Sequence, residues 1–210
     1  MKQGKIILIE GPDSTGKTSL YNAINNLTKA AYIHITKPQD DSEEAYLNMY
    51  RNTLKAAELI RDTGQYVVLD RHLISNIIYD RIFENIVRDN TEFIKTMFKT
   101  IDCFVMSLPS DKNVYLNKFE EMKATRAELY KDMSQIYDAY YDLWNGVDNL
   151  TDAELDNVCT DHEWYYEILR DWDSLRIYLV ENFQNCKWTH YDMQSTTLDK
   201  LEDFVKENII

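Results

Sequence analysis

The 210-residue sequence predicts an α/β domain, in which a parallel β-sheet carries helices on both of its faces. Short apolar runs rich in β-branched residues, such as Ile6–Ile9, alternate with segments whose apolar residues recur at helical spacing. Strands that alternate with helices pair in parallel through right-handed crossovers, which place helices on both faces. Two of the 5 glycines and one of the 3 prolines fall within residues 11–16, just after the first run. The loop after the first strand is therefore the first candidate for a functional site.

Each element follows from its own local pattern. The expected strands are the apolar or alternating runs Ile6–Ile9, Tyr32–Thr36, Tyr66–Asp70, Cys103–Ser107 and Trp188–Tyr191. One expected helix begins at a capping residue, Ser75, and carries Ile78, Ile82 and Ile86. The other expected helices have apolar residues at helical spacing over Leu20–Ala31, Leu47–Ala57, Thr91–Thr100, Phe119–Tyr140, Leu155–Leu179 and Leu198–Val205. We expect one domain over residues 1–210, with a lid at about 110–130 and a helical insertion at about 145–183.

Composition excludes several classes of protein. The 23 basic and 36 acidic residues give a net charge of −13, which disfavours binding to duplex nucleic acid. No apolar run approaches the ~20 residues of a membrane span, and no secretory leader is apparent. The three cysteines are an odd number without C-x-x-C spacing, so they indicate neither a disulfide framework nor a zinc site, which fits a reducing compartment. We therefore expect a cytoplasmic protein without a membrane partner, and leave a homodimer open.

The loop after the first strand matches the phosphate-binding motif G-x-x-x-x-G-K-[ST] in full, between a predicted strand and a predicted helix. Its residues are Gly11, Pro12, Asp13, Ser14, Thr15, Gly16, Lys17 and Thr18. In such a P-loop, backbone N–H groups surround the phosphates of ATP, the lysine neutralises their charge and the threonine hydroxyl binds Mg²⁺. A glycine-containing turn without a ligand is the alternative. The sequence thus predicts a P-loop NTPase-type sheet.

A second candidate for the nucleotide site is Asp70, which ends the predicted strand Tyr66–Asp70. A carboxylate at the end of a buried strand can hold Mg²⁺ or its water ligands. Arg71 follows directly and adds a cation at the same strand end. The alternative is a surface Asp–Arg pair with no role in binding.

These motifs resemble those of the thymidylate kinase group of nucleoside monophosphate kinases. Residues 10–18 resemble that group's E-G-x-D-G-x-G-K-[ST], and residues 70–72 resemble its D-R-[YF]. Thr36-Lys37-Pro38 stands where the group has an element such as Arg-Glu-Pro. The resemblance extends over residues 1–144 and, less clearly, 185–210.

The resemblance implies a role for each matching residue. Asp13 would bind the sugar 3′-hydroxyl of the acceptor nucleotide, while Arg71 and Lys37 would bind its 5′-phosphate. Arg51 would lie against the base edge. Ser75 and Tyr79 stand where the group's next helix has Ser and Tyr and would complete the acceptor site.

Three positions depart from the group's pattern. Ser14 replaces a glycine, Leu47 replaces the aromatic residue that stacks on the base, and Asp80 stands where glutamine is frequent. Tyr46 or Tyr50 could take over the stacking. The departures at Leu47 and Asp80 bear on which base is accepted and not on phosphoryl transfer.

Arg126 interrupts the apolar stripe of the expected helix Phe119–Tyr140. A cation on an inward-facing stripe is costly to bury unless it meets an anion. We therefore expect Arg126 to be a lid arginine that stabilises charge as the γ-phosphoryl group moves. The alternative is an arginine that packs along the core or pairs with a carboxylate such as Glu121.

The leading functional prediction is a Mg²⁺-dependent kinase that transfers the γ-phosphoryl group of ATP to a deoxynucleoside monophosphate, with Lys17, Arg71 and Arg126 as catalytic residues. A deoxynucleoside kinase is the nearest alternative, but it needs a carboxylate base where this sequence has Lys37. A kinase that acts on a modified base in DNA and an ATP-binding regulator also remain open.

Overall fold

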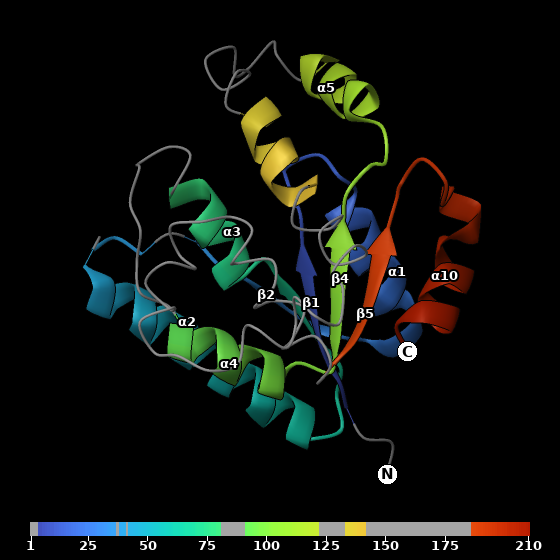
Figure 1. The fold of residues 1–210 in the computed structure, drawn as a ribbon. Coiled ribbons are helices and arrows are strands. Elements are labelled where there is room, and N and C mark those ends of the chain that lie inside the picture. Colours follow the sequence, from blue (N-terminus) through green and yellow to red (C-terminus); the bar gives the residue numbers. More distant parts are fainter. Residues whose placement is uncertain (1–3, 37, 41, 81–90, 122–132, 142–185) are drawn as a thin grey trace, which may run out of the picture.

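The computed structural model describes residues 4–36, 38–40, 42–80, 91–121, 133–141 and 186–210. Its centre is a five-stranded parallel sheet with the strand order β2-β3-β1-β4-β5 (Figure 1). The strands are β1 (Ile6–Glu10), β2 (Ala31–His34), β3 (Val67–Asp70), β4 (Cys103–Ser107) and β5 (Lys187–Tyr191). The predicted parallel α/β architecture is confirmed, because every neighbouring pair of strands runs in the same direction.

Helices cover both faces of the sheet. They are α1 (Lys17–Thr28), α2 (Glu43–Asp62), α3 (Leu73–Tyr79), α4 (Thr91–Thr100), α5 (Lys112–Glu121), a helix over 133–141, the 3-10 helix η4 (Leu198–Lys200) and α10 (Leu201–Asn208). α1 and α10 pack on one face, whereas α2, α3 and α4 pack on the other (Figure 1). In β1, Ile7 faces the first layer and Leu8 the second, so both are fully buried.

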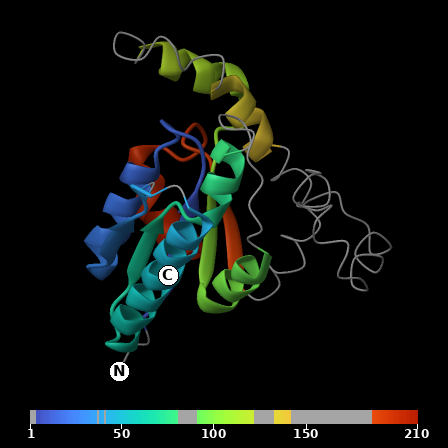
Figure 2. The same ribbon diagram turned by 90° about the vertical axis from the view of Figure 1, so that its left-hand side faces the viewer.

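The register of the strands brings their polar last residues to one edge. Ile9 of β1 lies beside Asp70 of β3, which in turn lies beside His34 of β2. Glu10 lies beside Met106 of β4. Because ligands of open parallel sheets bind outside the carboxyl ends of the strands, this edge is where a site is expected. α5 and the helix 133–141 lie at the same end of the sheet (Figure 1 and Figure 2).

Two helix predictions were wrong. Ser75 does not cap α3, which begins at Leu73 with His72 in the N-cap position. The predicted single helix Phe119–Tyr140 is replaced by separate helices, since the rings of Tyr115 and Tyr137 lie 5.1 Å apart. A straight helix would separate these two residues by roughly 33 Å.

This correction removes the argument that placed Arg126 on an inward stripe. Arg126, Lys37, the predicted helix positions Ile82 and Ile86, and the expected insertion at 145–183 all lie outside the described residues. Of the expected lid, the structure describes residues 110–121. Within the described parts of the chain, no helix is both long and apolar enough to span a bilayer.

Candidate nucleotide site

The phosphate loop joins β1 to α1 and winds tightly at the carboxyl end of the sheet. Gly11, Ser14 and Gly16 have φ angles of 145°, 64° and 88°, which turn the backbone repeatedly within a few residues. A Cβ atom on Gly11 would lie only 2.0 Å from the carbonyl oxygen of Ser107 on β4, so this position requires glycine. Ser14 adopts the left-handed conformation that costs a non-glycine residue about 1 kcal/mol.

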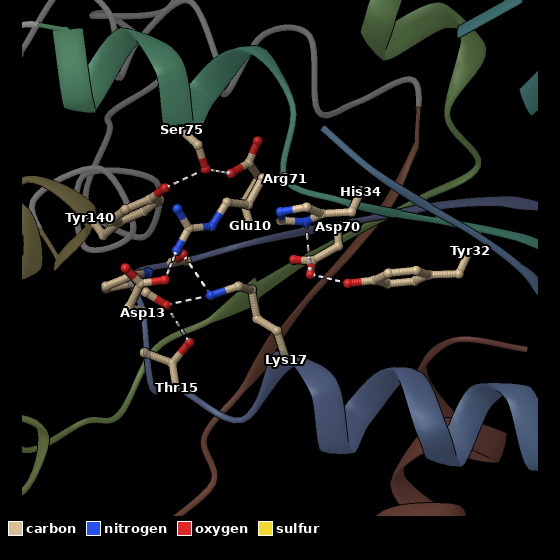
Figure 3. A network of polar contacts seen from close by, with 12 residues as sticks. Glu10, Asp13, Thr15, Lys17, Tyr32, His34, Asp70, Arg71, Ser75 and Tyr140 are labelled. Carbon is tan, nitrogen blue, oxygen red and sulfur yellow. Dashed lines mark hydrogen bonds and ion pairs between the residues drawn. The ribbon is translucent and has the colours of Figure 1, made fainter. Parts of the chain in front are cut away.

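Lys17, the first residue of α1, directs its ammonium group back into this loop (Figure 3). Its Nζ donates to the carbonyl oxygen of Gly11 at 3.0 Å and to that of Pro12. Burial, together with the nearby charge of Arg71, lowers the pKa of Lys17 to about 8, although the carboxylates of Asp13 and Asp70 oppose this shift. Two cations that repel each other at a loop of this shape favour the binding of an anion.

Asp70 is the last residue of β3, at the edge of the sheet where the phosphate loop lies. Its Oδ2 accepts a hydrogen bond from the hydroxyl of Tyr32 and lies 3.3 Å from Nδ1 of His34. Burial and the bond to Asp70 raise the pKa of Tyr32, so its hydroxyl keeps the proton that it donates. The Oδ1 atom of Asp70 is buried and has no hydrogen-bond partner among the residues that the structure describes.

This free carboxylate oxygen fits a hard cation such as Mg²⁺, and the side chain of Thr18 is exposed on the first turn of α1. Across the described ranges, His, Cys, Asp and Glu form no group of three that could hold a metal by themselves. Mg²⁺ typically keeps water ligands and is shared with substrate phosphates, so one carboxylate and one hydroxyl suffice.

Arg71 lies between the phosphate loop and α3 and contacts both (Figure 3). Its φ of 66° is left-handed, which is uncommon for a residue other than glycine. The guanidinium group forms an ion pair with Asp13 of the phosphate loop and lies 5.1 Å from the ring centroid of Tyr79 on α3. The predicted acceptor residues Asp13, Arg71 and Tyr79 therefore meet at one point.

Behind Arg71, Glu10 is a fully buried carboxyl group at the end of β1. It accepts hydrogen bonds from the backbone N–H of His72 at 2.8 Å and from the hydroxyl of Ser75. The Ser75 Oγ also lies 2.7 Å from the hydroxyl of Tyr140 in the helix 133–141. Burial raises the pKa of Glu10, although its hydrogen bonds and Arg71 oppose the shift.

His72 lies in an aromatic cluster beneath these groups. Its ring centroid is 5.1 Å from that of Tyr50 and 6.2 Å from that of Phe93. Burial lowers the pKa of His72 to about 3, so the imidazole is neutral at physiological pH. Neither ring nitrogen has a hydrogen-bond partner among the described residues.

Comparison with known proteins places this arrangement in a fold group. No protein-family model matches the chain, and no curated protein matches it by sequence. Among solved structures it is similar to the YorR protein of Bacillus subtilis in complex with phosphorylated GDP, with a TM-score of 0.59, 15% identity, and coverage of 96% of this chain and 94% of that one. It is also similar to thymidylate kinase from Candida albicans, with a TM-score of 0.51, 14% identity, and coverage of 98% and 90%.

The chain has a thymidylate kinase-like P-loop kinase fold. Within this fold, the structure brings the phosphate loop, Asp70, Arg71 and Tyr79 to one edge of the sheet, as the sequence predicted. Ser75 reaches the same region, but it is 3% exposed and its hydroxyl is engaged by Glu10 and Tyr140. Arg51 is exposed on α2 and takes no part in the polar contacts described above.

Four residues had no role predicted from the sequence; they contact site residues from behind or beside them and are not proposed to touch a nucleotide: Glu10, Tyr32, His34 and Tyr140. Two signals were available for Glu10, which opens the motif at residues 10–18 and is the charged last residue of an otherwise apolar strand. His34 shares its strand register with Asp70, but that pairing of β2 with β3 depends on strand order. Tyr140 belongs to an apolar stripe and carried no local signal.

Proposed function

We propose that the protein is an ATP-dependent kinase that transfers the γ-phosphoryl group to a deoxynucleoside monophosphate such as dTMP, giving the diphosphate in nucleotide metabolism. The observation that carries this proposal is the convergence of two cations on one loop: the buried Lys17 from the first residue of α1, and the largely buried Arg71 from the residue after β3. Lys17 binds the phosphates of ATP, and Arg71 binds the phosphate of the acceptor.

The ion pair between Arg71 and Asp13 supports this division of roles. An acceptor phosphate offers Arg71 two oxygens in the planar geometry that its guanidinium group prefers. Asp13, whose side chain is 46% exposed, would then accept a hydrogen bond from the sugar 3′-hydroxyl. Lys37, Arg51, Ser75 and Tyr79 complete the proposed acceptor site, and Arg126 is the proposed lid arginine.

Phosphoryl transfer between two phosphates needs alignment and charge neutralisation more than covalent chemistry. The acceptor phosphate is already a nucleophile, so no general base is required. Lys17 and the N–H groups of residues 11–18 would hold the donor phosphates, and Arg71 would hold the attacking one in line. Mg²⁺, bound by Asp70 and Thr18, would neutralise charge on the phosphates of ATP.

A screen of deoxynucleosides and their monophosphates for ADP release from ATP tests the proposal. We expect release with a monophosphate and none with the matching nucleoside. Turnover with nucleosides alone would instead indicate a deoxynucleoside kinase. No release with any acceptor would favour an ATP-binding regulator. The cytoplasmic location and a homodimer stay predictions from the sequence.

A further inference from the structure

The backbone of Arg71 is held in its left-handed conformation from both sides. Its own N–H donates to the carbonyl oxygen of Ile9 at 2.9 Å, and the N–H of His72 donates to Oε1 of Glu10 at 2.8 Å. Both acceptors lie on consecutive residues of β1. Left-handed residues other than glycine persist only where the surroundings determine them, and they cluster at functional sites.

The carboxyl group of Glu10 has partners for both of its oxygens, although no part of it is exposed. Because the hydroxyl of Ser75 donates to Glu10, the hydroxyl of Tyr140 donates in turn to Ser75. A buried carboxyl group is costly, and an apolar side chain would suit the end of a central strand at least as well. Its presence therefore calls for an explanation other than the packing of the core.

We propose that Glu10 is a positioning residue that fixes the left-handed backbone of Arg71 and so aims its guanidinium group across the phosphate loop. Glu10 reaches neither nucleotide, because it is buried beneath Arg71, and it acts through the peptide N–H of His72. The inference rests on the proposed function, in which Arg71 binds the acceptor phosphate.

Two substitutions of similar size separate the hydrogen bond from mere burial. Glu10→Gln keeps an oxygen that accepts from His72, and its amide group can donate to Ser75, whereas Glu10→Met offers no acceptor. We expect Glu10→Met to raise the KM for the acceptor monophosphate at least tenfold, with the KM for ATP within twofold, and Glu10→Gln to stay within threefold of wild type. An equal rise of the acceptor KM in Glu10→Gln and Glu10→Met would overturn the proposal.

Tyr140→Phe is the matched control, because it removes a buried hydroxyl from the far end of the same chain of hydrogen bonds. We expect its acceptor KM to stay within threefold of wild type. Should Glu10→Met not fold, Glu10→Asp takes its place, since a shorter carboxylate keeps the charge but withdraws the acceptor from His72. An acceptor KM in Tyr140→Phe that rises as far as in Glu10→Met would contradict the assignment.

A double-mutant cycle tests whether Glu10 acts through Arg71. In an Arg71→Ala background, Glu10→Met should change the acceptor KM less than twofold further. A tenfold further rise would mean that Glu10 affects the site by another route, and the proposal would fail.

A spectroscopic measurement tests Glu10 without any substrate. The side-chain Nε–H signal of Arg71 in the free protein can be assigned by its loss in Arg71→Lys. We expect this signal to shift or broaden in Glu10→Met and to keep its position in Tyr140→Phe. An unchanged signal in Glu10→Met would overturn the role of Glu10 whatever the acceptor is. A wild-type protein that uses no monophosphate would overturn the proposed function alone.

Discussion

Arg71 and Asp13 form an ion pair across the phosphate loop, although 58 residues separate them in the chain. The pair links the end of β3 to the loop after β1, and it places the cation proposed to bind the acceptor against the loop proposed to bind ATP. Asp13 is 46% exposed, and an ion pair with an exposed partner contributes little to stability, so the importance of this pair lies in where it holds the guanidinium group.

Replacing Arg71 should therefore affect the acceptor more than ATP. We expect Arg71→Ala to raise the KM for the monophosphate at least tenfold, with a smaller change for ATP, and Arg71→Lys to restore binding only in part because an ammonium group lacks the planar fork. Steady-state kinetics with each substrate varied in turn measure this. A change confined to the KM for ATP would move Arg71 to the donor site.

Lys17 should be essential for turnover. We expect Lys17→Ala to lower kcat by two orders of magnitude or more while thermal unfolding stays close to wild type, because the lysine neutralises phosphate charge. Lys55→Ala, an exposed lysine on α2, is the control and should leave kcat unchanged. Near-normal turnover in Lys17→Ala would refute the assignment of the phosphate loop.

The lowered pKa of Lys17, about 8, gives a pH dependence with a definite sign. Below that pH the ammonium group is charged and binds phosphate, and above it the charge is lost. We expect kcat/KM for ATP in the wild type to fall as the pH rises above about 8. The residual activity of Lys17→Ala should not show this fall at alkaline pH. If kcat/KM of Lys17→Ala falls in the same way, the fall belongs to a group other than Lys17.

Tyr32 should matter to the metal because its hydroxyl holds Oδ2 of Asp70 while Oδ1 is left for a ligand. Groups that orient a ligating carboxylate are worth roughly tenfold or more in metal affinity. We expect Tyr32→Phe to raise the Mg²⁺ concentration for half-maximal activity several-fold and to weaken Mn²⁺ binding in the presence of ATP. Tyr21→Phe, whose ring contacts that of Tyr32 at 4.3 Å, is the control for packing.

His72 should make the protein sensitive to acid. Its pKa is about 3 in the fold and ordinarily near 6.5, so the unfolded chain takes up a proton that the folded chain refuses. Its contribution to stability is therefore lost as the pH falls from about 6.5 toward 3. We expect His72→Phe to unfold less readily than wild type at pH 5, whereas His34→Gln should keep the acid sensitivity. Equal losses of stability in wild type and His72→Phe would contradict a neutral, buried imidazole.

Arg126 lies outside the described residues and remains a prediction from the sequence. If it stabilises charge only in the transition state, Arg126→Ala should lower kcat at least tenfold with little change in either KM. A lower melting temperature with normal kcat would instead indicate an arginine that packs or pairs on a helix.

The strands and the phosphate loop could be predicted because their signals are local: apolar runs bounded by polar residues, and a motif between a strand and a helix. The prediction of a single helix from Phe119 to Tyr140 was wrong because two separate helices that pack on one core show the same apolar spacing as one long helix. Tyr115 and Tyr137 belong to these two helices, and both lie in the same core. Ser75 suits an N-cap by residue type, yet α3 begins at Leu73.

The buried contacts around Arg71 could not be predicted from the sequence. Glu10, Ser75 and Tyr140 come from three separate segments, and no sequence pattern indicates that their side chains are in contact. The strand order that joins β1 to β3 creates the contact between Glu10 and His72. Tertiary structure therefore decides which polar residues support the site, even where a motif locates the site itself.

The proposed transfer to a phosphate is tested most directly by identifying the product. The protein, ATP and Mg²⁺ are incubated with dTMP, or in parallel with thymidine, and followed by ³¹P NMR. We expect the signals of dTDP and ADP to grow together with dTMP, and no phosphorylated product to form from thymidine. Formation of dTMP from thymidine, with dTMP itself left unchanged, would contradict the account.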